Sequence, residues 1–516
     1  MDIQLYSAEL IRSTGPLGLS ALLVFVLYYF LRVQRGLPVP PGPKGSPLVG
    51  VIREIPKQFA FLKFTEWARE YGPIYYTKIG FQGNLFINDP QVAADLFVKR
   101  SNIYSDRPPS VIGDIVSRGA RSVLMPYNKQ WRGIRKLFAS LLTPSKCDTI
   151  YNKWSEAEAV VTCHDILKYP DDLKRVMNRF SMSVVRSITY GRRAVHRDPH
   201  LMDSEEAAKN FIDAFRPGAF IIEYMPWLLK FPRFMQPGIT TLEKYRDMED
   251  KFNMDKWQET REIARKYPDR HTIISEINQL HDSKELSAEL TEMQCAATAM
   301  EIVGCLAKAH EELDRVIGQD RYPSWDEQDK LPYLRALIKE QQRWRPISPF
   351  SMSHYTFVED QYQGYRIPKN TVVRMNIWAM HHDPNRYPDP ERFMPERFLN
   401  HPLSASAYAN SSDVAARDHF AYGSGKRICV GLHLAERNLW NMVSRLIHTF
   451  NIEPLLDSDG TPKIPKLEEY TYGLVLLPPN FEAKFSVRSD KIRELLDREF
   501  VNTAKEGKLD SWEADV

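Results

Sequence analysis

The chain has 516 residues, of which 43% are hydrophobic and 26% charged; this ordinary globular composition excludes a disordered or low-complexity protein. Its 69 basic and 66 acidic residues give a net charge of +3, too even for a chain whose main partner is nucleic acid. The five cysteines are scattered without a zinc or disulfide spacing, which favours a reducing compartment.

The most apolar stretch of the chain lies near its start. Residues 15–31 carry no charge, and a bilayer span needs about 20 such residues. Arg32, Arg35 and Lys44 follow the stretch, whereas only Arg12 stands on its other flank. This asymmetry predicts a single N-terminal transmembrane helix with the rest of the chain in the cytosol. A cleaved signal peptide and an anchor that lies partly in the interface are the alternatives.

A proline-rich hinge follows the predicted anchor. Prolines fix the backbone φ angle, so residues 37–44 form a stiff spacer that holds the body at a set angle to the membrane. We therefore divide the chain into an anchor (1–36), the hinge (37–44) and one body (45–516), whose charged tail begins at about residue 488 and forms an exposed helix and solvated chain.

Helical periodicity dominates the body. In residues 432–450, apolar side chains recur at steps of three and four, which predicts an amphipathic helix. Short strand-like segments lie at residues 74–79, 84–87, 365–373 and 473–477. The pattern predicts a mainly α body with small β sheets.

The sharpest local feature is the segment 422–431, which reads Tyr-Gly-Ser-Gly-Lys-Arg-Ile-Cys-Val-Gly. Gly423 and Gly425 let the backbone turn tightly and approach a flat, bulky group. Cys429 stands at the start of the predicted helix, where backbone N–H groups and the helix dipole favour a thiolate. Such a thiolate is a metal ligand or a nucleophile; a buried structural cysteine is the alternative.

Two further motifs precede this segment. Glu340-Gln341-Gln342-Arg343 is an ExxR element on a predicted helix, and residues 393–398 (Phe-Met-Pro-Glu-Arg-Phe) form a PERF element. ExxR alone occurs by chance on many helices, but the order ExxR, PERF and cysteine loop resembles the cytochrome P-450 family of haem-thiolate monooxygenases. The resemblance spans nearly the whole chain and implies the family's α-rich triangular prism. It also implies a buried ion triad of Glu340, Arg343 and Arg397 that fixes the cysteine loop.

The resemblance further implies haem b as the cofactor. Cys429 would be the axial iron ligand. Residues at the family's propionate-binding positions are Trp131 and Arg135 (one helical turn apart), His354 and Arg427. Each of these alone would be assigned to a surface cation or a core side chain; together they form a cage for a dianionic porphyrin edge.

Membrane-anchored members of the family take electrons from NADPH through a diflavin reductase. Basic residues flank the motifs and suit an acidic partner of this kind, although a solvated basic face is the default for such a cluster: Lys129, Arg132, Lys136 and Lys426. The resemblance thus predicts a single-pass protein of the endoplasmic reticulum with a cytosolic, monomeric catalytic unit. The substrate-contact regions that the resemblance implies are mostly apolar. They would be residues 111–124, 211–235, 349–352 and 470–474, and they indicate a lipophilic, aromatic or polycyclic substrate.

The chain departs from the family at two places. Tyr422 replaces the usual phenylalanine, which keeps the aromatic face. A larger departure lies at Gly304-Cys305, where the run of small residues, acid and threonine that activates dioxygen, together with the start of the next helix, is missing. Thr298 and Glu301 lie three residues apart before this point and could stand in for the proton relay, but ordinary helix positions explain them better, so no catalytic residue is assigned.

Three explanations of the missing run compete: a gene-model error, a degenerate paralogue, and an enzyme with altered chemistry. The function that we predict is a monooxygenase that tailors a fungal secondary metabolite, because the amino-acid sequence of several segments resembles fungal members of the family with that role. Oxidation of a foreign aromatic compound is the close alternative. A haem protein without oxygenase activity and an O₂-independent isomerase are alternatives from other classes.

Overall fold

The computed structural model describes residues 37–47, 49–119, 121–196, 206, 209–211, 213–215, 219–266, 272–273, 275–276, 306–456, 458, 470, 475–476 and 482–503. The predicted anchor at residues 15–31 lies outside this part of the chain. Within the described ranges, no helix combines the length and apolarity that a membrane span requires.

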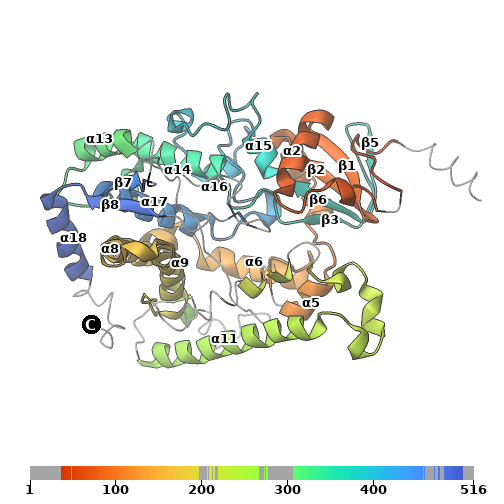
Figure 1. Ribbon diagram of the computed structural model, residues 1–516, viewed down its shortest axis with the longest axis horizontal. Coiled ribbons are helices and arrows are strands. Elements are labelled where there is room, and N and C mark those ends of the chain that lie inside the picture. The colour runs from red at the N-terminus through yellow and green to blue at the C-terminus, as the bar shows by residue number, and fades with distance from the viewer. Residues whose placement is uncertain are drawn as a thin grey trace, which may run out of the picture.

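One end of the molecule is a small twisted sheet (Figure 1). Strands β1 (Ile74–Ile79) and β2 (Gln82–Ile87) form a hairpin, β2 pairs in parallel with β6 (Thr371–Met375), and β3 (His354–Thr356) closes the order β1-β2-β6-β3. Helix α2 (Ala60–Tyr71) covers the sheet, and the Phe64 ring stacks on Phe86 of β2 at 4.7 Å between ring centroids. Two further antiparallel pairs are β4 (Asp360–Tyr362) with β5 (Tyr365–Ile367) and β7 (Phe450–Pro454) with β8 (Ala483–Val487).

The larger part of the molecule is helical, and helix α17 (Leu432–Thr449) lies at its centre. On one side Leu434, Met442 and Leu446 pack with buried residues of α8 (Asn152–Lys168) and α9 (Leu173–Tyr190). On the other side Trp440 and Val443 pack with α13 (Leu306–Val316) and α14 (Pro332–Trp344). The helix that carries the cysteine loop is therefore anchored in two cores.

The remaining helices connect these two parts. The long helix α11 (Ile239–Lys266) runs along one edge of the molecule and α6 (Lys129–Leu141) lies between that edge and the sheet (Figure 1). The shorter ones are α3 (Pro90–Ala93), α4 (Ser101–Tyr104), α5 (Val111–Ser117), α7 (Pro144–Lys146), α15 (Ile377–His381) and α16 (Ala405–Ala409).

The structure confirms the prediction of a mainly helical body with small sheets. The strands predicted at residues 74–79 and 84–87 are present, and the predicted helix at 432–450 is α17. The strand predicted at 365–373 is two strands, because Pro368 lacks an N–H donor and Asn370 adopts φ 62°. Most of the strand predicted at 473–477 lies outside the described residues.

The C-terminal tail is more than an exposed helix. Helix α18 (Asp490–Thr503) buries Ile492, Leu495 and Leu496, and Leu496 joins the core around α8. Charged residues stand between these apolar side chains, which explains why composition alone indicated an exposed helix.

Candidate functional site

The loop around Cys429 depends on glycine for its shape. Gly425, in the 3-10 turn η11 (Gly425–Arg427), adopts φ 65°, and a Cβ atom there would lie 2.0 Å from the carbonyl oxygen of Phe97. Only glycine combines this backbone conformation with so close an approach. The Cys429 N–H donates to the carbonyl oxygen of Tyr422 at 2.9 Å, which closes the loop just before α17.

The Cys429 thiol is accessible but closely surrounded. The residue is exposed to solvent, yet desolvation by the surrounding protein atoms raises the pKa of its thiol. The Gly431 N–H and Arg135 act in the opposite direction on this pKa but do not outweigh burial. A cation bound at Sγ would act against this shift and stabilise the thiolate. Cys147 and Cys163 are buried, with pKa values raised to about 11 and about 12, so they are unreactive.

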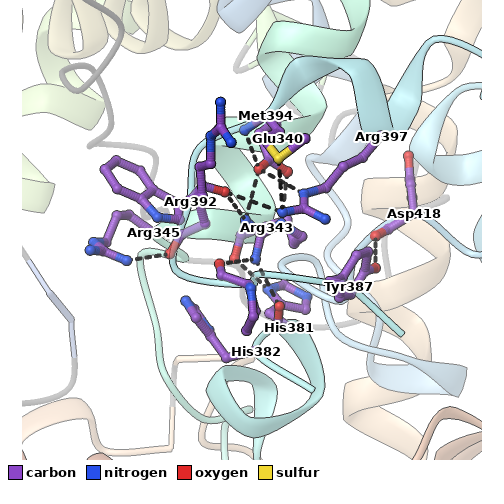
Figure 2. A network of polar contacts seen from close by, with 12 residues as sticks. Glu340, Arg343, Arg345, His381, His382, Tyr387, Arg392, Met394, Arg397 and Asp418 are labelled. Carbon is purple, nitrogen blue, oxygen red and sulfur yellow. Dashed lines mark hydrogen bonds and ion pairs between the residues drawn. The ribbon is translucent and has the colours of Figure 1, made fainter. Parts of the chain in front are cut away.

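The predicted ion triad is assembled and buried (Figure 2). Both carboxylate oxygens of Glu340 accept hydrogen bonds from Arg343, from Nε and Nη2, at 2.7 Å each. Arg397 Nε lies 3.4 Å from Glu340 Oε1, and the Met394 N–H donates to the same oxygen at 2.8 Å. The Glu340 and Arg343 side chains are inaccessible to solvent. Arg343 also donates to main-chain carbonyls of residues 381, 390 and 392, which ties α14 to the segment that contains the PERF turn η10 (Pro395–Phe398).

A second group of arginines gathers near Cys429. Arg427 donates to the carbonyl oxygens of Ser105 and Met125 at 2.8 and 2.9 Å. Arg107 donates to the carbonyl oxygen of Ser353 at 2.7 Å, and Arg135 donates to that of Ile428. Burial lowers the pKa of Arg107 to about 9 and of Arg427 to about 10, with further lowering from neighbouring arginines.

This arginine cluster (Arg107, Arg135 and Arg427) lacks matching negative charge. In the described ranges none of the three forms an ion pair, and Asp106 is the one carboxylate that raises the pKa of Arg107 and Arg427. Three guanidinium groups, one buried and two half-buried, together with one carboxylate leave about two positive charges, and charges withdrawn from water are normally paired. The cluster and the accessible thiol therefore fit a planar group that carries a dianionic edge and a metal ion.

Two other predicted residues adjoin the cluster. The Arg427 guanidinium stacks on the buried Trp131 ring at 4.0 Å from its centroid. His354 Nδ1 lies 2.6 Å from the carbonyl oxygen of Tyr104. A carbonyl only accepts, so Nδ1 carries the proton and Nε2 is a bare acceptor in the neutral ring. Burial, Arg107 and Arg427 hold the pKa of His354 well below its usual range, so His354 could donate to an anion from Nε2 only after gaining a proton.

Arg107 is the residue of this site that the sequence did not reveal. It stands alone in Asp-Arg-Pro-Pro, without a helical partner or a motif spacing. The chain fold brings it to the cluster through the loop before α5. By contrast, Thr298 and Glu301 lie outside the described residues.

The four predicted basic residues are exposed, on α6 and the cysteine loop: Lys129, Arg132, Lys136 and Lys426. Tyr127 joins two of them, because Lys426 Nζ lies 3.0 Å from its hydroxyl and Arg132 lies over its ring at 5.6 Å. These cations lower the pKa of Tyr127.

The segments predicted to contact substrate are adjacent in two pairs. Ile112 and Val116 of α5, in the first segment, form one apolar cluster with Ile222 of the second and Leu242 of α11. Phe350, in the third segment, packs on the cluster that contains Tyr470 of the fourth.

Comparison with known proteins extends these observations. The profile of the family described as "Cytochrome P450" matches residues 40–305 and 304–485. The chain is 32% identical over 529 residues to Cytochrome P450 monooxygenase macC of Penicillium terrestre, covering 97% of this chain and 98% of that protein. It is 34% identical over 526 residues to Cytochrome P450 monooxygenase patI of Penicillium expansum and 31% identical over 522 residues to yanC of Aspergillus niger, covering 95–96% of every chain concerned.

The family match bears on the departure at Gly304-Cys305, because its two parts, residues 40–305 and 304–485, meet at these residues.

Proposed function

This chain belongs to the cytochrome P450 family of monooxygenases, and on that premise we propose that it binds haem through Cys429 and inserts one oxygen atom from O₂ into a lipophilic substrate. The observation that carries the proposal is the exposed Cys429 beside the buried Arg107 and the half-buried Arg135 and Arg427, with Asp106 as the one carboxylate that acts on Arg107 and Arg427. Haem bound there supplies the oxygen chemistry, and a cysteine thiolate ligand favours O–O cleavage.

The chain's own residues would hold and enclose that group. Arg107, Arg135 and Arg427 would exchange carbonyl partners for the two propionates, gaining charge-assisted hydrogen bonds. Ile112 and Val116 of α5, packed on Ile222, would exclude water and orient an apolar substrate.

The basic residues around Tyr127 support a reductase as the electron donor. Charge reversal of Lys129 and Arg132 together should raise the reductase concentration needed for half-maximal turnover, and more so at low salt, because steering by exposed charges is screened. Lys251→Glu on α11, also exposed, is the matched control. Equal effects in both variants would count against this docking face.

We also propose attachment to the endoplasmic reticulum membrane. Besides the apolar residues 15–31, large hydrophobic side chains are exposed along turns η5 (Ile221–Glu223), η6 (Pro226–Lys230) and η7 (Arg233–Met235), with Phe234 89% exposed. Exposed large hydrophobic side chains gathered in one segment are typical of an interaction site. Recovery of the full chain in the alkaline-washed membrane fraction tests this, and recovery in the soluble fraction would contradict it.

The chemical test of the main proposal uses the full chain with haem, NADPH and a fungal reductase. We expect a thiolate-type ferrous–CO spectrum and substrate oxidation, both lost in Cys429→Ser and retained in Cys147→Ser, which alters a buried cysteine elsewhere. Relatives from three fungi support tailoring of a fungal secondary metabolite, with a foreign aromatic compound as the other substrate class. Metabolite profiles of a gene-deletion strain separate the two.

The meeting of the profile matches at Gly304-Cys305 favours a second candidate, a haem protein that lacks O₂-dependent turnover. The messenger sequence across the codons for residues 300–313 distinguishes the candidates. Extra codons that encode a Gly-x-Asp/Glu-Thr run would restore the ordinary monooxygenase; a transcript that reads straight through would favour an inactive or O₂-independent protein.

A further inference from the structure

His381 lies between the ion triad and the cysteine loop. It is the last residue of α15 and is fully buried. Its carbonyl oxygen accepts a hydrogen bond from Arg343 Nη1 at 2.9 Å, and its Nδ1 lies 3.1 Å from the carbonyl oxygen of Arg343. Figure 2 shows this double contact beneath the Arg343 side chain. At the other edge of the ring, Nε2 lies 2.8 Å from the Phe420 N–H.

These partners fix the proton on the ring. The Phe420 amide can only donate, so Nε2 must be bare, and the Arg343 carbonyl can only accept, so Nδ1 must carry the hydrogen. Burial and the neighbouring His419, His382, Arg343 and Arg386 favour this neutral form by holding the pKa of His381 well below its usual range. A proton on Nε2 would oppose the Phe420 N–H and break the contact.

Phe420 is connected with Cys429 through the backbone of the cysteine loop. The Gly423 N–H donates to the carbonyl oxygen of Phe420 at 2.9 Å, and the Cys429 N–H donates to that of Tyr422 at 2.9 Å. On the neighbouring stretch Arg417 donates to the Gly423 carbonyl oxygen at 2.6 Å. Two backbone hydrogen bonds therefore join the segment at Phe420 to Cys429.

We propose that neutral His381 is a positioning residue that joins the Glu340–Arg343 pair to the cysteine loop and so sets the place of the Cys429 thiolate. The role of the thiolate rests on the haem-binding function proposed above, whereas the link from Arg343 to Phe420 does not. His382 offers the contrast: it is 1% exposed, stacks on Trp378 at 4.2 Å, and its Nδ1 lies 3.0 Å from the Trp378 carbonyl oxygen, away from the loop.

Two substitutions at position 381 separate the two edges of the ring. The amide of His381→Gln reaches the place of Nε2 and can accept from the Phe420 N–H. The amide of His381→Asn reaches only the place of Nδ1, so it keeps the contact with the Arg343 carbonyl and leaves the Phe420 N–H unpaired. In both variants the main-chain carbonyl of residue 381 still accepts from Arg343 Nη1, so the connection to Arg343 is kept. His382→Gln is the control for loss of an equally buried imidazole.

Two measurements test the connection from His381 through Phe420 to Cys429. In haem-free protein, hydrogen–deuterium exchange of the peptide that contains Phe420 should be about tenfold faster in His381→Asn, because an unpaired buried N–H carries a penalty of that order. In haem-loaded protein, the ratio of thiolate-type to inactive ferrous–CO complex should fall by about tenfold in the same variant. His381→Gln and His382→Gln should stay within about threefold of wild type in both.

The proposal would be overturned if His381→Asn and His381→Gln gave the same exchange rate and the same ratio of ferrous–CO complexes. It would also be overturned if His382→Gln lost as much as His381→Asn in these measurements. Either result would show that the imidazole of His381 only fills space. If the wild-type chain takes up no haem, the haem-binding function fails, but the exchange measurement still decides whether His381 holds Phe420.

Discussion

Two groups of charged side chains in this molecule differ in whether each charge has a partner of opposite sign. Arg343 and Arg397 both form ion pairs with Glu340, so every charge of this group has a partner of opposite sign, and in that sense the group is complete. The cluster of Arg107, Arg135 and Arg427 is incomplete, since in the described part of the chain it forms no ion pair and Asp106 is the one carboxylate that acts on Arg107 and Arg427. A complete group serves structure, and an incomplete one is where a charged ligand gains the most.

The complete group sets one prediction. Glu340→Gln keeps the side-chain shape but leaves two arginines buried without a counter-charge, so the free energy of unfolding should fall by about 3 kcal/mol or more. Urea unfolding measures this. Glu311→Gln, at an exposed position of α13, should change it by less than about 0.5 kcal/mol. A loss at Glu340 as small as that of the control would mean that carbonyl groups alone satisfy the arginines.

The incomplete group sets another. Arg107→Gln removes one of the cations proposed to hold a propionate, so haem should dissociate about ten to a hundred times faster, the size expected for a charged hydrogen bond. Transfer of haem to an acceptor globin measures the rate. Arg53→Gln, at an exposed position of turn η1 (Ile52–Glu54), should leave it unchanged. An unchanged rate in Arg107→Gln would assign Arg107 to loop structure, through its bonds to residues 123 and 353.

At the scale of the element, the cysteine loop is shaped by two glycines with different constraints. Gly425 and Gly423 both adopt positive φ, 65° and 78°, but a Cβ at 425 would meet the Phe97 carbonyl at 2.0 Å, whereas at 423 the nearest atom lies 4.0 Å away. Backbone strain acts at both positions and a steric clash at only one.

The two alanine variants should therefore differ. Gly423→Ala should cost about 1 kcal/mol of stability from backbone strain alone. Gly425→Ala must displace the loop from Phe97 and should cost several-fold more, with loss of haem content. Urea unfolding and haem per protein measure both, and similar values for the two variants would show that the loop yields at Phe97 without penalty.

At the scale of the whole molecule, buried neutral histidines couple stability to pH. The pKa is lowered to about 4 for His419 and about 3 for His382, and lies well below its usual range for His354 and His381, in each case chiefly by burial. The unfolded chain binds protons at these rings below about pH 6.5, while the folded chain does not. Stability is therefore retained above that pH and is lost as the pH falls toward the folded values.

For haem-free protein, the free energy of unfolding should drop between pH 6.5 and 5 by up to about 1.4 kcal/mol per pH unit for each of these four rings. Glu436, whose pKa burial raises, opposes the trend, but it is a single group. Urea unfolding at pH 7, 6 and 5 tests this. His382→Gln should reduce the slope of the free energy of unfolding against pH by the contribution of one histidine ring. A flat profile would contradict the burial of neutral rings.

The sequence by itself determined the local features of this protein. Periodicity and turn residues depend on near neighbours, so α17, β1 and the glycine loop followed from the order of residues. The motif order, together with the resemblance it carries, indicated Glu340, Arg343, Arg397 and Cys429 as one site. It also indicated the break at Gly304-Cys305, where the two profile matches meet.

Only the tertiary structure decided which distant groups share a charge or a hydrogen bond. Arg107 lies hundreds of residues before Arg427 in the chain, and tens of residues separate His381 from Arg343 and Phe420; no sequence spacing indicates either contact. The sign of the Cys429 pKa shift also depended on packing, because desolvation by the surrounding fold outweighs the local N–H groups that the sequence revealed. Burial and long-range electrostatics are properties of the assembled chain, and local sequence patterns do not specify them.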